Sequence, residues 1–365
     1  MTSCTATAIV ELDALADHLE AILASIATHD MQVEQAEDHY RIRAAFGQAR
    51  LTVRGAGLHI EIATPDRASL NRMKHGLAGP IGFIAAKARP RIRWMGEQTG
   101  LVALADLRVV HVVSTQALTP MMRRVVLAGE DLGHLARADQ MHCRLIFAPE
   151  GEAEPAWPML DDQGHIVWPA GKMATRVYTL RKVQGDRITI DFALHEHAGP
   201  ATRWALSARP GARVGVVGPA AGGPRAADLH VMLGDETGLP GIARMLESLP
   251  SQARGHAFIE VRDAACEVAL QAPAGVAVRW LHRGAAPAGT TLLLPQALRQ
   301  VDWPQDLSGV FVWAGCEYQA FRQMHRYLKH ELGLPRACQL LYSHWHRTLS
   351  EEQIIEIGGE AYLPE

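Results

Sequence analysis

Apolar and polar positions change their spacing twice along this chain, and each change predicts a different kind of domain. In the first part, apolar residues keep helical spacing over 12–26 and again from about 68 to 86. Alternating segments, which predict strands, lie between them at 40–46, 50–53 and 58–62. A basic run at 87–93 predicts a linker or a solvated helix end. We therefore expect a small α+β domain over residues 1–97.

The middle of the chain is rich in β-type segments. Six short runs separated by turns predict an antiparallel barrel, and they lie at 108–113, 123–127, 141–148, 175–181, 187–194 and 213–217. The stretch 149–172 is rich in proline, glycine and acids, which predicts a surface loop and allows a lid over a site. We expect this domain to span 98–225.

After residue 228, strands and helices alternate, which is typical of a parallel sheet in an α/β domain. The candidate strands are 229–233, 257–261, 276–280 and 309–313, and the candidate helices are 239–249, 292–300 and 318–332. The expected fold class is therefore multidomain, α+β and β plus α/β. A small α+β domain precedes an antiparallel barrel, and residues 226–365 form a parallel-sheet domain with a C-terminal tail.

Composition limits the classes of function. The 365 residues, 48% hydrophobic and 21% charged, suffice for two or three cores. Lysine and arginine total 36 against 39 acids, so a net charge of -3 provides no field for nucleic acid or an anionic membrane. Five scattered cysteines argue against a disulfide framework and a cysteine-ligated metal, and they favour a reducing cytoplasm. We expect no membrane insertion, because no apolar run reaches roughly 18 residues.

The most informative motif is the predicted strand 176–181, Arg-Val-Tyr-Thr-Leu-Arg. Alternation places Arg176 and Tyr178 on one face and Thr179 and Arg181 on the other. A cation for phosphate, a flat ring for stacking and a hydroxyl for hydrogen bonding suit a flavin nucleotide. Alone, such a hexamer is more simply an exposed β-favouring strand, so its meaning depends on the motifs that follow it.

The next motifs place polar groups at turns. The turn 199–202 leads into a short helix, so backbone amides and the Thr202 hydroxyl can meet a diphosphate there; an ordinary threonine-capped turn is the alternative. The loop 234–241 follows an apolar strand and precedes a helix, where open α/β sheets bind ligands. Its Asp235 or Thr237 can equally cap that helix. Because acids repel phosphate at a helix N-terminus, we expect this loop to lie beside a ring system rather than a diphosphate.

The order of these motifs, followed by 313–317 at the end of a strand, resembles the siderophore-interacting proteins. These are FAD-dependent ferric-siderophore reductases of the ferredoxin-reductase-like superfamily, in which a barrel precedes an α/β domain. The resemblance covers roughly 108–347. The segment 342–347 departs from the family's Gly-Tyr-Trp pattern, and Gly238 replaces an alanine of its Asp-Glu-Thr-Ala-x-Pro signature. The N-terminal domain resembles a small domain of uncharacterised function found beside such proteins.

The resemblance implies a role for each motif. Arg176 would reach the FAD diphosphate, Tyr178 would stack on the isoalloxazine, and Thr179 would bond near its reactive atoms. The implied cofactor-binding residues are Arg176, Tyr178, Thr179, Arg181, Asp191, Phe192, His195, Gly199, Ala201, Thr202, Trp204, Asp235, Glu236, Thr237, Gly315, Cys316 and Trp345. The residues implied in binding an anionic ferric chelate are Arg203, His346 and Arg347. Neither a catalytic protein nucleophile nor a resident metal is implied.

By the resemblance, NAD(P)H reduces FAD by hydride transfer, and single electrons then pass to Fe(III) in a siderophore, which releases ferrous iron. Two alternatives remain: a flavin reductase for a quinone, a ferredoxin or another acceptor, and a non-catalytic siderophore-binding protein. NADPH or NADH also stays open, because Arg262 near the ribose would favour a 2′-phosphate and Asp263 would oppose it. We expect a monomeric, cytoplasmic enzyme whose partner is a ferric siderophore.

Overall fold

The computed structural model of the protein describes residues 4–27, 31–55, 57–97, 100–149, 152, 154–195 and 199–358. The chain forms two compact units, which are described separately. Unit 1 comprises Met1–Leu107, Pro149–Met173 and Glu352–Leu363, and unit 2 comprises Arg108–Ala148 and Ala174–Glu351, with the last two residues of the chain. None of the described helices combines the length and the apolar content that a membrane crossing requires.

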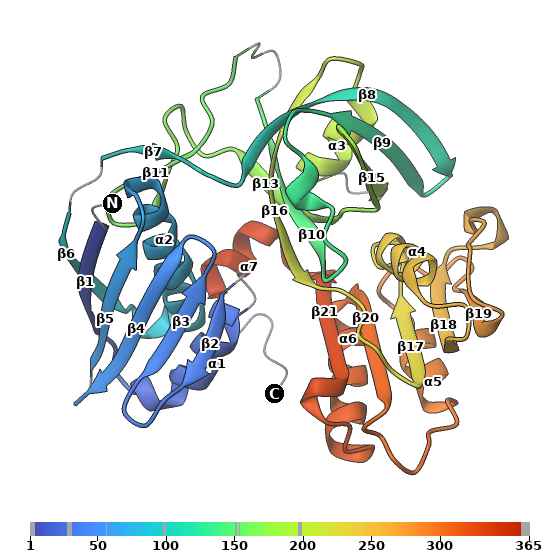
Figure 1. Ribbon diagram of the computed structural model, residues 1–365. Coiled ribbons are helices and arrows are strands. Elements are labelled where there is room, and N and C mark those ends of the chain that lie inside the picture. The colour runs from blue at the N-terminus through green and yellow to red at the C-terminus, as the bar shows by residue number, and fades with distance from the viewer. Residues whose placement is uncertain are drawn as a thin grey trace. The chain divides into compact units, whose positions relative to one another are not determined.

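Unit 1 is built on a six-stranded antiparallel sheet and two helices (Figure 1). The strands are β1 (Cys4–Glu11), β2 (Gln32–Gln35), β3 (Tyr40–Ala44), β4 (Gly47–Arg54), β5 (Gly57–Thr64) and β6 (Arg91–Gly96), in the order β2-β3-β4-β5-β1-β6. The helices are α1 (Leu15–Ala27) and α2 (Arg67–Ile84). Ile22 and Ile26 of α1 and Met73 of α2 are fully buried in one core with Leu51 and Ile60 of the sheet. The α+β expectation for this part of the chain is confirmed.

The basic run at 87–93 differs from its prediction as a linker or a helix end. After the short 3-10 turn Ala86–Ala88, it enters β6, which pairs antiparallel with β1. Ile92 and Trp94 pack on the core while Arg91 and Arg93 are exposed. The alternation that builds this strand is hidden in the sequence because arginines fill its outer positions.

The proline- and glycine-rich stretch after residue 149 is also more structured than a loop. It forms β11 (Met159–Leu160) and β12 (Ile166–Val167), which join β7 (Val102–Ala103) in a small sheet. Buried Lys74 of α2 donates from Nζ to the main-chain oxygen of Asp162 at 2.6 Å, and Asn71 of α2 donates to Gly100 at 3.2 Å. Buried polar groups need such partners, so this stretch completes unit 1.

The first part of unit 2 is a seven-stranded antiparallel barrel-like sheet in the order β13-β10-β16-β8-β9-β15-β14. Its strands are β8 (Leu107–Thr119), β9 (Met122–Ala128), β10 (Gln140–Phe147), β13 (Ala174–Thr179), β14 (Lys182–Gln184), β15 (Arg187–Ala193) and β16 (Arg213–Gly222). Helix α3 (Pro200–Ser207) packs with Ala201 and Ala205 into the core of this sheet. The expected barrel is confirmed.

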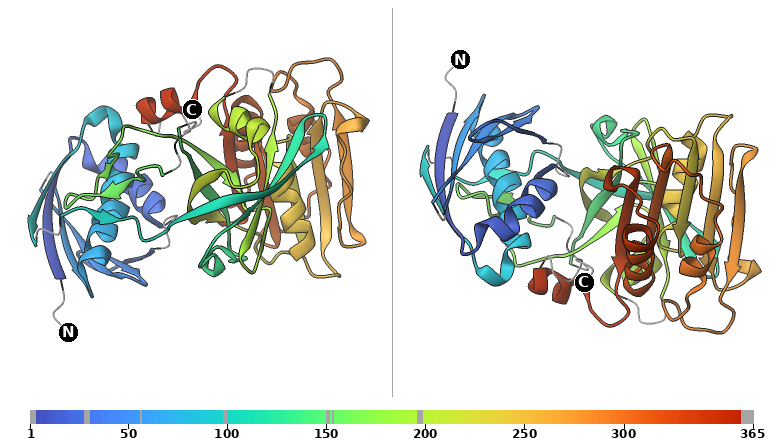
Figure 2. Two further views of the ribbon diagram at one scale, coloured as in Figure 1. Left: turned by 90° about the horizontal axis from the view of Figure 1, so that it is seen from above. Right: turned by 90° about the horizontal axis from the view of Figure 1, so that it is seen from below.

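The second part of unit 2 is a parallel sheet in the order β19-β18-β17-β20-β21. Its strands are β17 (Leu229–Gly234), β18 (Arg254–Val261), β19 (Gly275–His282), β20 (Val310–Glu317) and β21 (Gln339–Trp345), and its helices are α4 (Leu239–Ser248), α5 (Leu293–Arg299) and α6 (Tyr318–Arg326). Successive β17 residues face opposite cores, Val231 with α5 and α6, and Met232 with α4. The right view of Figure 2 shows α6 in front of the strands. The expected α/β domain is confirmed, while β21 had no sequence prediction.

Candidate functional site

Strand β13 carries the first group of predicted site residues. The side chain of Arg176 is 19% exposed, and its Nη1 donates to the main-chain oxygen of Thr175 at 2.7 Å. The ring of Tyr178 lies 4.4 Å from that of fully buried Phe192, and burial raises the pKa of the Tyr178 hydroxyl. Thr179 is buried on the opposite strand face. A guanidinium and a supported flat ring therefore stand two residues apart on one face.

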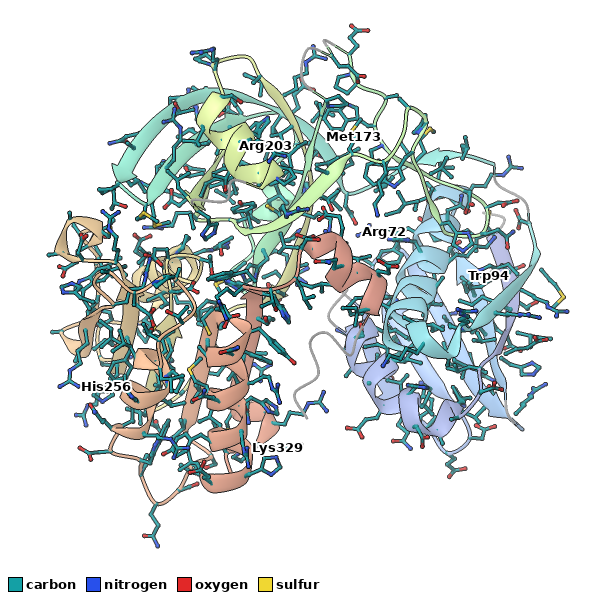
Figure 3. All side chains as sticks on the ribbon, turned by 180° about the vertical axis from the view of Figure 1, so that it is seen from behind. Arg72, Trp94, Met173, Arg203, His256 and Lys329 are labelled. Carbon is teal, nitrogen blue, oxygen red and sulfur yellow. The ribbon has the colours of Figure 1, made fainter. Side chains whose placement is uncertain are left out.

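Helix α3 offers a place for a diphosphate. Gly199 is its N-cap and makes no side-chain capping bond, and proline follows it. Ala201 and Thr202 are buried, and the ring of Trp204 packs 5.4 Å from that of Phe147, which anchors the helix. Arg203 is exposed on α3 (Figure 3). The first-turn amides of this helix have no capping side chain at Gly199, which fits an anion such as the FAD diphosphate.

Two buried histidines bring nitrogen atoms without hydrogen-bond partners next to strand β13. His142 of β10 is the cross-strand partner of Thr179, and its ring lies 5.5 Å from that of His344 of β21. Within the described residues, both nitrogens of His142 and Nε2 of His344 have no hydrogen-bond partner. Burial lowers the pKa of His142 to about 3, so this ring is neutral. Buried polar atoms without partners are costly, so these two rings lower the stability of this part of unit 2.

Asp235 joins the carboxyl ends of three strands of the parallel sheet. One oxygen, Oδ1, accepts from the main-chain N of Thr237 at 2.8 Å and from its Oγ1 at 2.5 Å. The other, Oδ2, accepts from the main-chain N of Glu317 at 3.0 Å and from Nε1 of Trp345 at 2.8 Å. Thr237 Oγ1 also lies 3.2 Å from His344 Nδ1. Since the hydroxyl hydrogen goes to the carboxylate, His344 carries its proton on Nδ1.

Glu236 is held by two arginines rather than facing outward. Its Oε1 accepts from Arg283 Nη1 at 2.7 Å and from the main-chain N of Arg262 at 3.2 Å, and burial raises the pKa of the Glu236 carboxyl. The Arg262 guanidinium pairs with Asp263 at 2.8 Å and its side chain is 40% exposed. Asp263 caps a short turn by accepting from the amide of Ala265. Arg262 is therefore an accessible cation at this end of β18.

Gly315 and Cys316 end β20 in a close-packed region. A Cβ at Gly315 would lie 2.5 Å from Cε1 of His344 and 2.8 Å from the ring of Trp313, so only glycine fits there. Cys316 is fully buried, and burial raises the pKa of its thiol well above the usual value. The thiol therefore stays protonated and packs as a small apolar group.

Arg181 and Asp191 lie in an ion-pair network beside a cavity. Asp191 accepts from Nε and Nη2 of Arg124, both at 2.7 Å, and Arg181 bonds Glu247 of α4. The cavity has a volume of about 360 Å³ and is lined by the Arg124, Arg181 and Asp191 side chains, by Leu239 of α4 and by apolar residues around 268–270. In this arrangement Arg181 and Asp191 hold the barrel and α4 together.

The C-terminal site residues surround the end of β21. The Trp345 ring lies 5.4 Å from that of His195, and burial lowers the pKa of His195. His346 stacks on Tyr318 with ring centres 4.0 Å apart. The main-chain N of Arg347 donates to Glu317 at 3.1 Å. Trp345 is thereby fixed at the carboxyl end of the parallel sheet.

An antiparallel barrel with an arginine–tyrosine strand, joined to a parallel sheet whose strand ends carry polar loops, defines the two-domain flavin reductase class. Within it, the chain belongs to the siderophore-interacting protein family. Residues 111–223 match the siderophore-interacting FAD-binding domain, and 227–348 match the siderophore-interacting protein domain. Residues 5–95 match an uncharacterised protein conserved in bacteria.

Named relatives match about two thirds of the chain. The chain is 29% identical over 252 residues to ferric vibriobactin reductase ViuB of Vibrio cholerae, which covers 67% of this chain and 91% of that protein. It is 30% identical over 247 residues to the NADPH-dependent ferric-chelate reductase of Escherichia coli, covering 66% and 92%. A crystal structure of a siderophore utilization protein from T. fusca is 39% identical with a TM-score of 0.61, covering 70% and 96%.

Sequence reasoning missed several residues that the fold adds to this site. Arg144 of β10 donates from Nη1 to Thr175 Oγ1 at 2.9 Å and thus lies beside the strand of Arg176. His142 and Arg283 were also absent from the predicted set. A polar residue inside the apolar run 141–147 was the available signal for Arg144 and His142, because such positions are unfavourable without a partner.

Proposed function

We propose that this protein is an FAD-dependent ferric-siderophore reductase that uses NAD(P)H. The observation that carries the proposal is the convergence in unit 2 of the Arg176–Tyr178 strand, the uncapped α3 N-terminus and the strand ends joined by Asp235. Two relatives are named as ferric reductases, which supports the same activity. Bound FAD would supply hydride acceptance and one-electron release to Fe(III) in the siderophore.

The barrel, formed by strands β8–β10 and β13–β16, would hold the flavin nucleotide. Arg176 and the first-turn amides of α3 would bind the diphosphate, Tyr178 would stack on the ring system, and Thr179 would bond its polar edge. Phe192 and Trp204 are core residues in this structure and would support these groups from behind.

The parallel-sheet domain, which holds strands β17 to β21, would bind the nicotinamide nucleotide. Close approach of the nicotinamide to Gly315 is not available on the side of its missing Cβ, because His344 and Trp313 fill that space; Asp235 would fix Trp345 beside the nucleotide instead. The half-exposed Arg262 favours NADPH over NADH, because Asp263 is committed to its own turn and to Arg262.

The substrate would be an anionic ferric chelate, with the iron as cargo held by the siderophore. Exposed Arg203 and the Arg347 side chain would attract it, with His346 beside them. We also infer a monomer in the cytoplasm. The five cysteines are all free thiols in the structure, which supports a reducing compartment.

The test is an anaerobic absorbance spectrum of the purified protein, followed by NADPH or NADH, a ferric siderophore and a ferrous-iron trap. The expected result is a flavin spectrum that bleaches with nucleotide and returns as ferrous iron appears. Bleaching without ferrous iron would move the proposal to a quinone, a ferredoxin or another acceptor. A colourless protein that takes up no added FAD would refute the cofactor and favour a siderophore-binding protein.

A further inference from the structure

The arginines of β10 and β13 share a carboxylate from the C-terminal end of the chain. Glu351, the first residue of α7 (Glu351–Ile357), places Oε1 2.9 Å from Nη1 of Arg144 and Oε2 3.4 Å from Nε of Arg176. The side chain of Glu351 is 19% exposed and that of Arg176 is 19% exposed. One carboxylate thus bridges two guanidiniums.

This arginine pair is suited to a larger anion than one carboxylate. Arg144 also donates to Thr175 Oγ1 at 2.9 Å, so a hydroxyl lies at the same place. Guanidiniums bind phosphate oxygens in the same forked manner as carboxylates, and a diphosphate carries more charge. Glu351 therefore occupies a position that an incoming diphosphate would need, and like charges so close together oppose each other.

We propose that Glu351 is an internal competitor for the anion site of Arg144 and Arg176. The proposal rests on the proposed function, because the FAD diphosphate is the anion expected at Arg176. Binding of the diphosphate displaces Glu351 from the two guanidiniums.

The test measures anion binding to the FAD-free protein by calorimetry with inorganic pyrophosphate, and FAD binding by flavin fluorescence. Glu351→Gln keeps the shape and removes the charge, so we expect both ligands to bind about fivefold more tightly. Glu351→Asp keeps the charge and should stay near the wild-type affinity. Glu356→Gln, an exposed acid on the same helix, is the matched control and should change neither. Equal or weaker binding to Glu351→Gln would overturn the proposal, because the carboxylate would then orient the arginines or be irrelevant.

Far-UV circular dichroism confirms that each variant is folded. Pyrophosphate binding that tightens in Glu351→Gln, in a protein that never takes up FAD, would uphold the competitor and refute the proposed cofactor.

Discussion

Asparagine in place of Asp235 tests whether this carboxylate holds the strand ends together. In the wild-type protein, its two oxygens accept four hydrogen bonds, two from Thr237, one from the Glu317 amide and one from Trp345. Asp235 is 7% exposed, so water does not readily replace a lost acceptor. Asparagine has the same shape but offers one oxygen and one NH₂ donor.

The expected cost follows from the two ways in which the amide can sit. With its nitrogen toward Glu317 and Trp345, two donors lose their acceptor. With the amide turned over, only the main-chain N–H of Thr237 loses its acceptor. The Thr237 hydroxyl keeps its partners, because it can accept from the NH₂ and donate to His344 instead. The turned orientation is favoured, and one unsatisfied buried donor lowers the free energy of unfolding by about 1–3 kcal/mol.

The assay is urea unfolding followed by tryptophan emission, with activity measured in parallel. Asp306→Asn is the matched control, because Asp306 also accepts a main-chain N–H, from Ser308, but lies exposed. We expect the control to cost less than about 1 kcal/mol, since water can replace the bond. In Asp235→Asn, the proton of His344 should also move from Nδ1 to Nε2, which nitrogen NMR detects. Stability equal to that of the control, with an unchanged His344 tautomer, would refute the reasoning.

Four further predictions concern single residues. Burial raises the pKa of Glu260 from 4.5 to about 7. Its protonated form therefore stabilises the folded chain below pH 4.5, and about 3 kcal/mol of the free energy of unfolding is lost as pH rises through 7. Glu260→Gln should flatten that part of the pH-stability curve, and an unchanged curve would contradict the shift. Gly315→Ala should lower stability by about 1–3 kcal/mol and slow NAD(P)H oxidation, because its Cβ would press on His344; normal kinetics would show that the position of the His344 ring does not affect the reaction. Cys316→Ala should leave turnover unchanged, and a collapse of turnover with FAD bound would give the thiol a chemical role. Arg176→Gln should weaken FAD binding roughly tenfold in a fluorescence titration, and unaltered affinity would remove this residue from the diphosphate site.

The fold was predictable where a segment's own pattern matches its final surroundings. The spacing over 12–26 predicted α1 because its apolar stripe faces a single core. The apolar run at 229–233 predicted β17 because that strand is buried on both faces. Strand β21 escaped prediction because all seven of its residues are half-buried, so its sequence neither alternates nor forms an apolar run. Its identity as a strand depends on its partner β20, which no local pattern reveals.

The site shows the same division between local motif and distant partner. The motif after β17 was recognisable in the sequence, but the bond from Asp235 to Trp345 joins residues 110 positions apart, and that from Thr237 to His344 spans 107. Glu351 reaches Arg144 across 207 positions. The pairs made by Asp235 and Thr237 arise from topology, because parallel strands bring their carboxyl ends to one edge whatever their order in the chain.

The acids of the 234–238 loop illustrate what a motif can conceal. From sequence, an acid at a strand end facing a helix indicates a ligand contact or a cap. In the structure, both oxygens of Asp235 accept two hydrogen bonds each from the protein itself, and Oε1 of Glu236 accepts from Arg283 and from the Arg262 amide. Asp235, saturated in this way, has little left to offer a cofactor directly. Its effect on the reaction would instead pass through Trp345, whose ring it holds. If Trp345 must be oriented for hydride transfer, Asp235→Asn should change kcat more than it changes the KM for NAD(P)H. A rise in KM alone would make Asp235 a direct contact of the nucleotide.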